Sequence, residues 1–217
     1  MIAFRSMYSA GNLFIPAPHG RLEAILKETS VQPVAGVALV LHPHPLGGGT
    51  MHNKVVFRAA GALNEAGFVT LRFNFRGVGQ STGTHDEGRG EQDDVRLALD
   101  YLDQNYPGVP ITLCGFSFGS RVGIEIGLAD KRVRNLISIG TPVRKYDFRF
   151  LSDCRKPILF VQGSRDEFGS PAELQRVIDQ IPAPTEIKLV VVPDADHFFT
   201  GHLDELKQAI AEWIKRD

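Results

Sequence analysis

The pentapeptide GFSFG, residues 115–119, carries the clearest chemical signal in the sequence. It directly follows the apolar residues 111–114 and directly precedes a segment with helical character up to residue 129. Where a strand turns sharply into a helix, glycines two positions before and after the central residue remove side chains that would collide. The turn then holds the central side chain out from the sheet. This pattern predicts that Ser117 is a nucleophile.

The same turn places a backbone N–H where it can stabilise negative charge. Phe118 would begin the helix, so its N–H lies at the positive end of the helix dipole. A donor at this position can bind the oxyanion that forms when a serine attacks a carbonyl group. A second donor is expected from the loop HPHPLGGG, residues 42–49. Because proline has no N–H, we expect Leu46 to supply this donor, with Gly47 as the alternative.

A serine hydroxyl needs a base to remove its proton, and the base needs an acid to orient it. His197 follows the last apolar run, residues 187–192, within a short loop, and Asp166 stands on the loop after the run 158–161. The carboxyl ends of parallel strands meet at one edge of a sheet, so both loops are expected beside Ser117. We therefore predict that His197 is the general base and that Asp166 orients it.

Three other carboxylates compete with Asp166 for the role of the acid. Glu167, Asp194 and Asp196 stand on the same two loops, and Asp166 could instead cap the helix that follows it. Asp194 and Asp196 are too close to His197 in the chain to bend comfortably back onto its Nδ1 atom. With these two disfavoured, we predict Asp166 as the acid, and the order Ser, Asp, His along the chain is that of the α/β-hydrolase fold.

Apolar runs that alternate with helical stripes indicate the α/β class. Continuously apolar runs, typical of parallel strands buried between two helical layers, occur at residues 37–41, 68–75, 111–114, 136–139, 158–161 and 187–192. Apolar positions at spacings of three and four predict helices within 53–66, 95–102, 174–181 and 203–214. Asp93 and Asp94 are then expected to be favourable charges in the first turn of the second of these helices.

The first 30 residues and the later connections complete the expected fold. Residues 12–15 and 21–27 predict an antiparallel hairpin at one sheet edge. The connection between residues 139 and 158 is too short to hold a cap domain. We expect a single domain over residues 1–217, with an α/β-hydrolase fold, a mostly parallel doubly wound sheet, an N-terminal antiparallel hairpin and no cap domain.

Composition argues against several classes of partner. The chain has 217 residues, of which 43% are hydrophobic and 23% are charged, and its net charge is -1. This balance offers no basic surface for nucleic acid or an anionic membrane, and no apolar run approaches the roughly 20 residues of a membrane span. Residues 1–18 show no signal-peptide pattern, so we expect a cytoplasmic protein. Cys114 and Cys154 are expected to be reduced core residues.

The remaining motifs favour structural explanations. His42 and His44 could bind zinc, but no further ligands follow at a matching spacing, so we expect no metal and no cofactor. Residues 76–83 are rich in glycine but lack the phosphate-loop signature, which argues against nucleotide binding. Arg76 is expected instead to donate to carbonyl groups of the loop 42–49 and to hold its shape.

Two segments resemble those of a known group of enzymes. Residues 42–55 (HPHPLGGGTMHNKV) and 73–83 (FNFRGVGQSTG) resemble the small bacterial α/β hydrolases related to dienelactone hydrolases, and the similarity extends over nearly the whole chain. The resemblance implies a lidless hydrolase with Ser117, Asp166 and His197 as catalytic triad, Leu46 and Phe118 as oxyanion donors, and carboxylesterase-like activity. Dienelactone hydrolases carry a cysteine nucleophile where this chain has Ser117, so the resemblance does not extend to their reaction.

These observations predict a serine hydrolase that cleaves small esters through an acyl-enzyme on Ser117. Acyl thioesters and amides are alternative substrates, because the same triad serves each acyl group. A binding module without catalytic activity on the same fold is a third alternative. The cleft is expected to be open and edged by the aromatic residues Phe168, Phe198 and Phe199. The sequence leaves the oligomeric state and the physiological substrate open.

Overall fold

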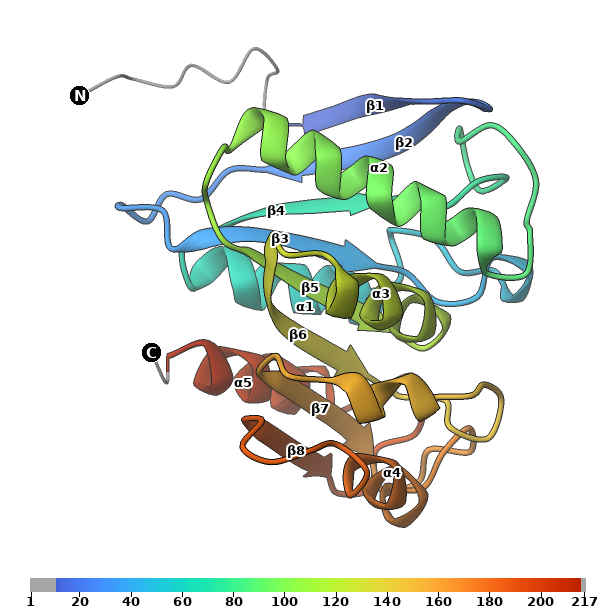
Figure 1. Ribbon diagram of the computed structural model, residues 1–217, viewed down its shortest axis with the longest axis vertical. Helices are drawn as coiled ribbons and strands as arrows, with labels where there is room; N and C mark the ends of the chain where they lie inside the picture. The colour runs from blue at the N-terminus through green and yellow to red at the C-terminus, as the bar shows by residue number, and fades with distance from the viewer. Residues whose placement is uncertain (1–10, 216–217) are drawn as a thin grey trace.

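Six parallel strands form the centre of the structure (Figure 1). The computed structural model describes residues 11–215. In sheet order the parallel strands are β4 (Phe68–Phe73), β3 (Gly36–Leu41), β5 (Ile111–Phe116), β6 (Val133–Ile139), β7 (Ile158–Gly163) and β8 (Ile187–Val192). Each strand that the apolar runs predict is present. The mostly parallel α/β sheet is thereby confirmed.

The N-terminal hairpin extends this sheet on one side. β1 (Gly11–Ala17) and β2 (Gly20–Lys27) pair in antiparallel register, and β2 also pairs antiparallel with β4. The strand order is β1-β2-β4-β3-β5-β6-β7-β8. The predicted antiparallel hairpin is confirmed, and it forms one edge of the sheet.

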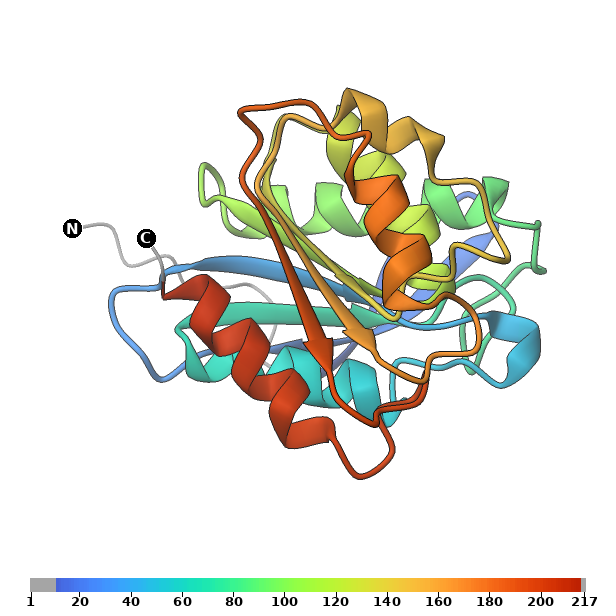
Figure 2. The same ribbon diagram turned by 90° about the horizontal axis from the view of Figure 1, so that it is seen from below.

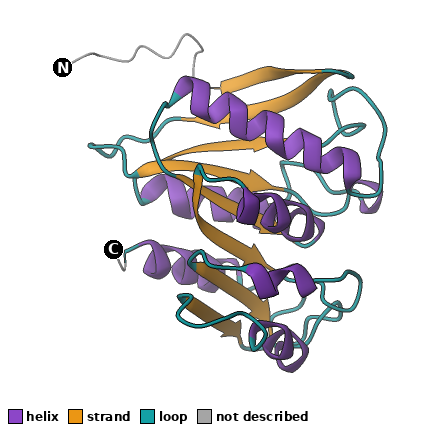
Figure 3. Ribbon diagram, viewed as in Figure 1, coloured by secondary structure: helices purple, strands orange, loops and turns teal. Residues whose placement is uncertain are grey.

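Within residues 11–215, five α-helices cover the two faces of the sheet (Figures 2 and 3). α1 (Lys54–Glu65) and α5 (Leu203–Ile214) lie on one face and contact each other. α2 (Arg89–Asn105), α3 (Phe118–Ala129) and α4 (Pro171–Ile178) lie on the other. Each face therefore has its own hydrophobic cluster, which explains why the central strands are apolar on both sides.

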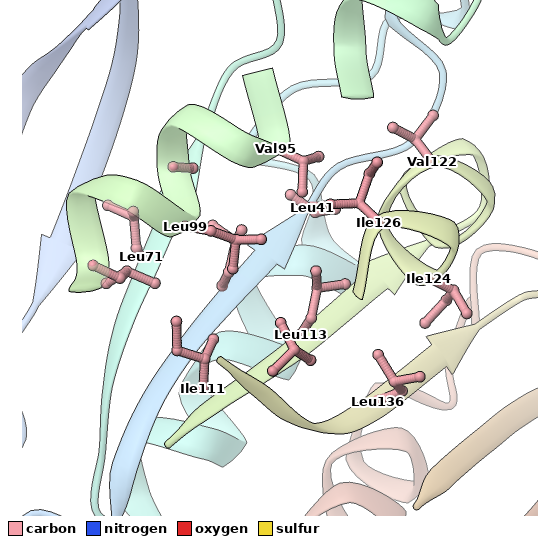
Figure 4. Packing of buried hydrophobic residues seen from close by; sticks show 14 of the residues in the cluster. Leu41, Leu71, Val95, Leu99, Ile111, Leu113, Val122, Ile124, Ile126 and Leu136 are labelled. Atoms are coloured by element: carbon pink, nitrogen blue, oxygen red, sulfur yellow. The ribbon is translucent and has the colours of Figure 1, made fainter. Parts of the chain in front are cut away.

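The larger cluster fixes α2 and α3 on the sheet (Figure 4). Side chains of α2 and α3 meet leucines of β3, β4 and β5, and the residues involved include Val95, Leu99, Val122, Leu41, Leu71 and Leu113. All of these are at most 2% exposed. Burial of each such side chain contributes about 1.5–3 kcal/mol. This packing fixes the position at which α3 begins, directly after β5.

β8 differs from the expectation that every parallel strand is buried. Four of its six residues are half-buried and one is exposed, because β8 is the last strand of the sheet and has a neighbour on one side only. Its apolar sequence does not reveal this position, since continuous runs predict a helical layer but not the place of a strand in the sheet.

The structure corrects the roles predicted for Arg76, Asp93 and Asp94. α2 begins at Arg89, so both aspartates lie beyond its first turn. Asp94 is fully buried and accepts hydrogen bonds from the backbone and side-chain N–H groups of Arg76, at 2.8–3.2 Å. Arg76 therefore joins the end of β4 to α2, and its guanidinium is not bonded to the loop 42–49.

The course of the chain through the sheet defines where a ligand can bind. From β3 the chain continues to β4 on one side, whereas β5 pairs with β3 on the other side and the later strands extend from there. In open α/β sheets, ligands bind at the carboxyl ends of strands where this change of direction occurs. The loop 42–49 and Ser117 both leave the sheet at this point. The connection 140–157 contains only the short helix η2 (Arg149–Asp153), which confirms that no cap domain is present there.

Candidate active site

Ser117 stands in a strained turn between β5 and α3. Its φ of 55° and ψ of -119° lie in a region of backbone conformation where residues other than glycine are uncommon. A Cβ atom at Gly115 would lie 2.4 Å from the carbonyl oxygen of Gly119, and a Cβ at Gly119 would lie 2.6 Å from that of His42. Both glycines are therefore required by close backbone contacts. The turn has the geometry that the pentapeptide predicts.

Ser117, His197 and Asp166 form one chain of hydrogen bonds. The Oγ atom of Ser117 lies 2.9 Å from Nε2 of His197, and Nδ1 of His197 lies 2.8 Å from Oδ2 of Asp166. The side chains of His197 and Asp166 are 2% and 0% exposed. A carboxylate can only accept, so Nδ1 carries the proton and Nε2 is left to accept from the serine hydroxyl. The structure thus brings the three predicted residues together.

The competing carboxylates have other contacts. Asp194 pairs with Arg165, and Asp196 accepts a hydrogen bond from the N–H of Thr200 at 2.9 Å. Glu167 is exposed, and its backbone carbonyl accepts from Arg144. The helix that follows Asp166 is capped by Ser170, in a reciprocal arrangement with Glu173. Asp166 is therefore the carboxylate that contacts His197.

Gln162 is a site residue that the sequence reasoning missed. Its side chain is fully buried at the end of β7, and its Nε2 atom donates to Oδ2 of Asp166 at 2.9 Å. The same amide donates to the carbonyl oxygen of Gly169 at 2.7 Å and accepts from the N–H of Thr141 at 2.8 Å. It ties the loop after β6 to the loop after β7 that carries Asp166. A single polar residue within the apolar run of β7 was the available signal.

The loop 42–49 folds into a tight turn that bonds its own N–H groups. The N–H of Leu46 donates to Nδ1 of His44 at 3.1 Å, and the N–H of Gly47 donates to the carbonyl oxygen of His44 at 3.0 Å. The Leu46 side chain is 78% exposed. Both N–H groups named from the sequence as candidate oxyanion donors thus already have partners within the loop.

With this geometry established, comparison with known proteins identifies the family. Residues 36–214 match the family model described as an alpha/beta hydrolase domain. The chain belongs to the α/β hydrolase family. The match spans every parallel strand of this hydrolase and ends in α5.

Relatives and solved structures define the branch of the family more closely. An uncharacterized protein of Rickettsia prowazekii is 38% identical over an alignment of 210 residues, and the alignment covers 93% of this chain and 87% of that protein. An alpha-beta serine hydrolase homologue from Coxiella burnetii has a TM-score of 0.89 and 36% identity, over 95% of this chain and 98% of that one. A serine hydrolase without a lid from Xanthomonas campestris has a TM-score of 0.86 and 35% identity, over 98% and 97%. This α/β hydrolase is a small, lidless member related to serine hydrolases.

Ser117 and His197 face a cleft of about 460 Å³ in this hydrolase. Its other lining residues come from the loop 42–49, the start of α1, the connection after β6, and the loops after β7 and β8: Pro43, His44, Gly47, Gly48, Gly49, Asn53, Pro142, Lys145, Tyr146, Phe168 and Phe198. Phe168 packs against the His197 ring with centroids 4.5 Å apart. The expectation for Phe199 is wrong, because this side chain is fully buried in the core between α5 and the sheet.

His42 has a structural role in the hydrolase. It is fully buried, its Nδ1 donates to the carbonyl oxygen of Pro43 at 2.7 Å, and its Nε2 accepts from the N–H of Phe75 at 3.0 Å. Burial lowers the pKa of His42 from 6.5 to about 4, although the bond to Pro43 acts in the opposite direction. Both ring nitrogens therefore have partners, and the bond from Phe75 links the end of β3 to the segment after β4. Within residues 11–215, no group of three or more His, Cys, Asp or Glu side chains is placed to hold a metal ion.

Both cysteines lie in the interior, as the sequence analysis expects. Cys114 and Cys154 are free thiols with 0% exposure, and burial raises the pKa of each. A thiol that stays protonated is a poor nucleophile. Over the described part of the chain, no helix has the length and hydropathy needed to cross a bilayer.

Proposed function

We propose that this hydrolase cleaves small carboxylic esters through an acyl-enzyme on Ser117. The observation that carries the proposal is the continuous hydrogen-bonded chain from Ser117 through His197 to Asp166, with both distances below 3 Å. A nucleophile, a base in contact with it and an acid that orients the base are the components of acyl transfer. The serine also opens onto a cleft that a small ester can enter.

In the first half of the reaction, Ser117 attacks the ester carbonyl while Nε2 of His197 accepts its proton. The imidazolium that forms is stabilised by Asp166, to which Gln162 and the N–H of Phe168 also donate. His197 then gives the proton to the leaving alkoxide as the ester C–O bond breaks. The alcohol leaves and Ser117 carries the acyl group.

In the second half, water replaces the alcohol. His197 accepts a proton from the water as its oxygen attacks the acyl carbonyl, and it returns that proton to Oγ of Ser117 when the acid is released. The open cleft lets water reach the acyl-enzyme without movement of a lid. No cofactor takes part in this sequence.

The negative charge on the carbonyl oxygen requires two hydrogen-bond donors. Phe118 begins α3, so its N–H has no partner within the helix and lies at the positive end of the helix dipole. We propose Phe118 as one donor. We expect the second donor from the loop 42–49, where Leu46 and Gly47 are the candidates from the sequence.

The test compares the wild-type protein with Ser117→Ala on p-nitrophenyl esters and acyl-CoA thioesters of graded chain length. Ester hydrolysis by the wild type and a loss of at least about 10³-fold in the variant are expected. Thermal melting of both proteins controls for folding. Equal ester hydrolysis by both would contradict the proposal, whereas turnover of thioesters alone would replace the ester assignment by the thioesterase alternative.

A further inference from the structure

The backbone N–H groups of residues 43–49 can be assigned to their partners one by one. Pro43 and Pro45 have no N–H. The N–H groups of Gly47 and Gly49 both donate to the carbonyl oxygen of His44, each at 3.0 Å, and that of Gly48 donates to the carbonyl oxygen of Pro45 at 3.1 Å. The N–H of Leu46 donates to the His44 imidazole.

His44 is the exception in this accounting. Among the residues that the structure describes, its N–H has no hydrogen-bond acceptor, although His44 lines the same cleft as Ser117. Its φ of -53° and ψ of 123° give an extended backbone between two prolines, which restricts its movement. Residues 43–49 therefore present one restrained N–H group that makes no hydrogen bond within the loop.

The His44 side chain organises the turn that follows it. The imidazole is the cap of the short helix η1 (Pro45–Gly47), because Nδ1 accepts the N–H of Leu46. Since Nδ1 accepts, the ring is neutral with its proton on Nε2. Burial is the main cause that lowers the pKa of His44, which favours this neutral form. The N–H groups of Leu46, Gly47 and Gly49 thus all donate to His44.

The same ring contacts the residue that begins α3. The centroid of the His44 ring lies 5.0 Å from that of Phe118 and 4.9 Å from that of His85. Nδ1 of His85 lies in turn 2.8 Å from Oε1 of the fully buried Glu91 in α2. Glu91 itself accepts the N–H groups of Asp86 and Gly88. These contacts fix the loop 42–49 against the start of α3.

We propose that His44 serves the oxyanion of the proposed ester hydrolysis in two ways. Its backbone N–H is the second donor, opposite Phe118, and its imidazole is a positioning group that holds the turn 45–48 and thereby aims that N–H. This assignment rests on the proposed function. It replaces Leu46 as the donor, because the N–H of Leu46 already donates to the His44 imidazole and so holds the turn.

The structure of the wild-type protein after phosphonylation of Ser117 tests the donor directly. A fluorophosphonate bound to Oγ leaves a phosphonyl oxygen at the position of the oxyanion. We expect this oxygen within about 2.7–3.1 Å of the N–H nitrogens of His44 and Phe118. Contact with the nitrogen of Leu46 or Gly47 instead would overturn the inference and leave the proposed function intact. Failure to label Ser117 would instead contradict the proposed function.

Proline substitution removes single N–H groups and separates the two roles of His44. The φ of His44 suits proline, so His44→Pro deletes the N–H and the imidazole, whereas His44→Ala deletes the imidazole only. Relative to His44→Ala, we expect His44→Pro to lower kcat by about 10²–10³-fold with little change in KM. Leu46→Pro, which removes the donor named from the sequence, should lower kcat only about fivefold, as expected for loss of one cap bond.

Conservative variants at position 44 test the positioning role. Asn can accept the N–H of residue 46 as a cap, so His44→Asn should retain kcat within about twofold of wild type, whereas His44→Ala should lose about fivefold. His44→Phe keeps a ring against Phe118 but has no acceptor and should resemble the Ala variant. Equal kcat for Asn and Ala would overturn the role of the imidazole.

If His44→Pro does not fold, a 10²-fold loss in Leu46→Pro would still overturn the donor assignment, and a fivefold loss would support it.

Discussion

At the scale of single residues, the site depends on a second layer of contacts that holds Asp166. Gln162 donates to Asp166 and to the backbone of Gly169, and it accepts from Thr141. Asp166 needs such partners because a buried carboxylate without donors is costly. Gln162 on β7 therefore orients His197 indirectly, by holding the Asp166 carboxylate that contacts it.

Replacing Gln162 by methionine should separate positioning from stability. Gln162→Met keeps approximately the side-chain volume but removes every hydrogen bond of the amide, so we expect kcat to fall about tenfold and the protein to lose about 2 kcal/mol of stability. Asn64→Leu is the matched control, since Asn64 is a buried amide that bonds the backbone of Glu28 and Phe68. The control should lose similar stability in urea unfolding while its kcat stays unchanged. An equal loss of kcat in both variants would show that Gln162 acts through stability alone.

The sequence predicts the site residues to different degrees. Ser117 could be found because its turn is local, and the strand, glycines and helix that define it are contiguous. His197 and Asp166 followed from their positions at the carboxyl ends of strands. Gln162 and His44 could not be assigned in this way, because their contacts are made across loops whose shapes are not encoded in a local pattern. The buried role of Asp94 was missed for the same reason.

At the scale of elements, two buried polar contacts connect the end of β4 to its neighbours. His42 joins β3 to the residue Phe75, and Asp94 in α2 binds Arg76. The His42 contact holds the end of β3, from which the loop 42–49 begins, and the Asp94 contact holds the segment after β4 against α2. We expect the contribution of His42 to stability to depend on pH. We expect the contribution of Asp94 to be large, because its removal leaves the charge of Arg76 unpaired.

His42 should make the stability of the protein depend on pH below neutrality. Its pKa of about 4 in the folded state lies below its value of 6.5 when unfolded, so the unfolded state binds the proton first. The contribution is fully present above pH 6.5 and is lost as the pH falls towards 4. At pH 5, about 2 kcal/mol should be missing relative to pH 7.5.

Urea unfolding at pH 7.5, 6 and 5 measures this contribution. His42→Gln cannot titrate, so its loss of stability between pH 7.5 and 5 should be smaller than that of the wild type by about 2 kcal/mol. The variant will be less stable at pH 7.5, because Gln does not reproduce both ring bonds. Parallel pH profiles for the two proteins would contradict the assignment of His42 as a buried neutral histidine.

Asp94 should stabilise the protein much more than an exposed ion pair does. Asp94→Asn removes the negative charge that pairs with the mostly buried Arg76 guanidinium. We expect the free energy of unfolding to fall by about 3 kcal/mol. Asp147→Asn removes the exposed pair with Arg149 and should change stability much less. Chemical denaturation of both variants checks the difference. Similar losses would mean that Arg76 finds water or another acceptor when Asp94 is neutralised.

At the scale of the whole molecule, the pattern of apolar runs was sufficient to predict the fold class but not the order of the strands. Continuous runs require helices on both faces, and the structure has two hydrophobic clusters separated by the sheet. The runs do not distinguish central strands from β8, whose half-exposed residues show that it lies at the edge. The change of direction between β3 and β5 then places the loop 42–49 opposite Ser117, and the cleft forms between them.

Covalent labelling tests the central claim that this arrangement activates Ser117. The wild type and Ser117→Ala are treated with a fluorophosphonate, and each is measured by intact-protein and peptide mass spectrometry. We predict one adduct per wild-type chain, located on the peptide that contains residues 115–119, and no adduct on Ser117→Ala. An adduct on another residue, or equal labelling of both proteins, would contradict the account.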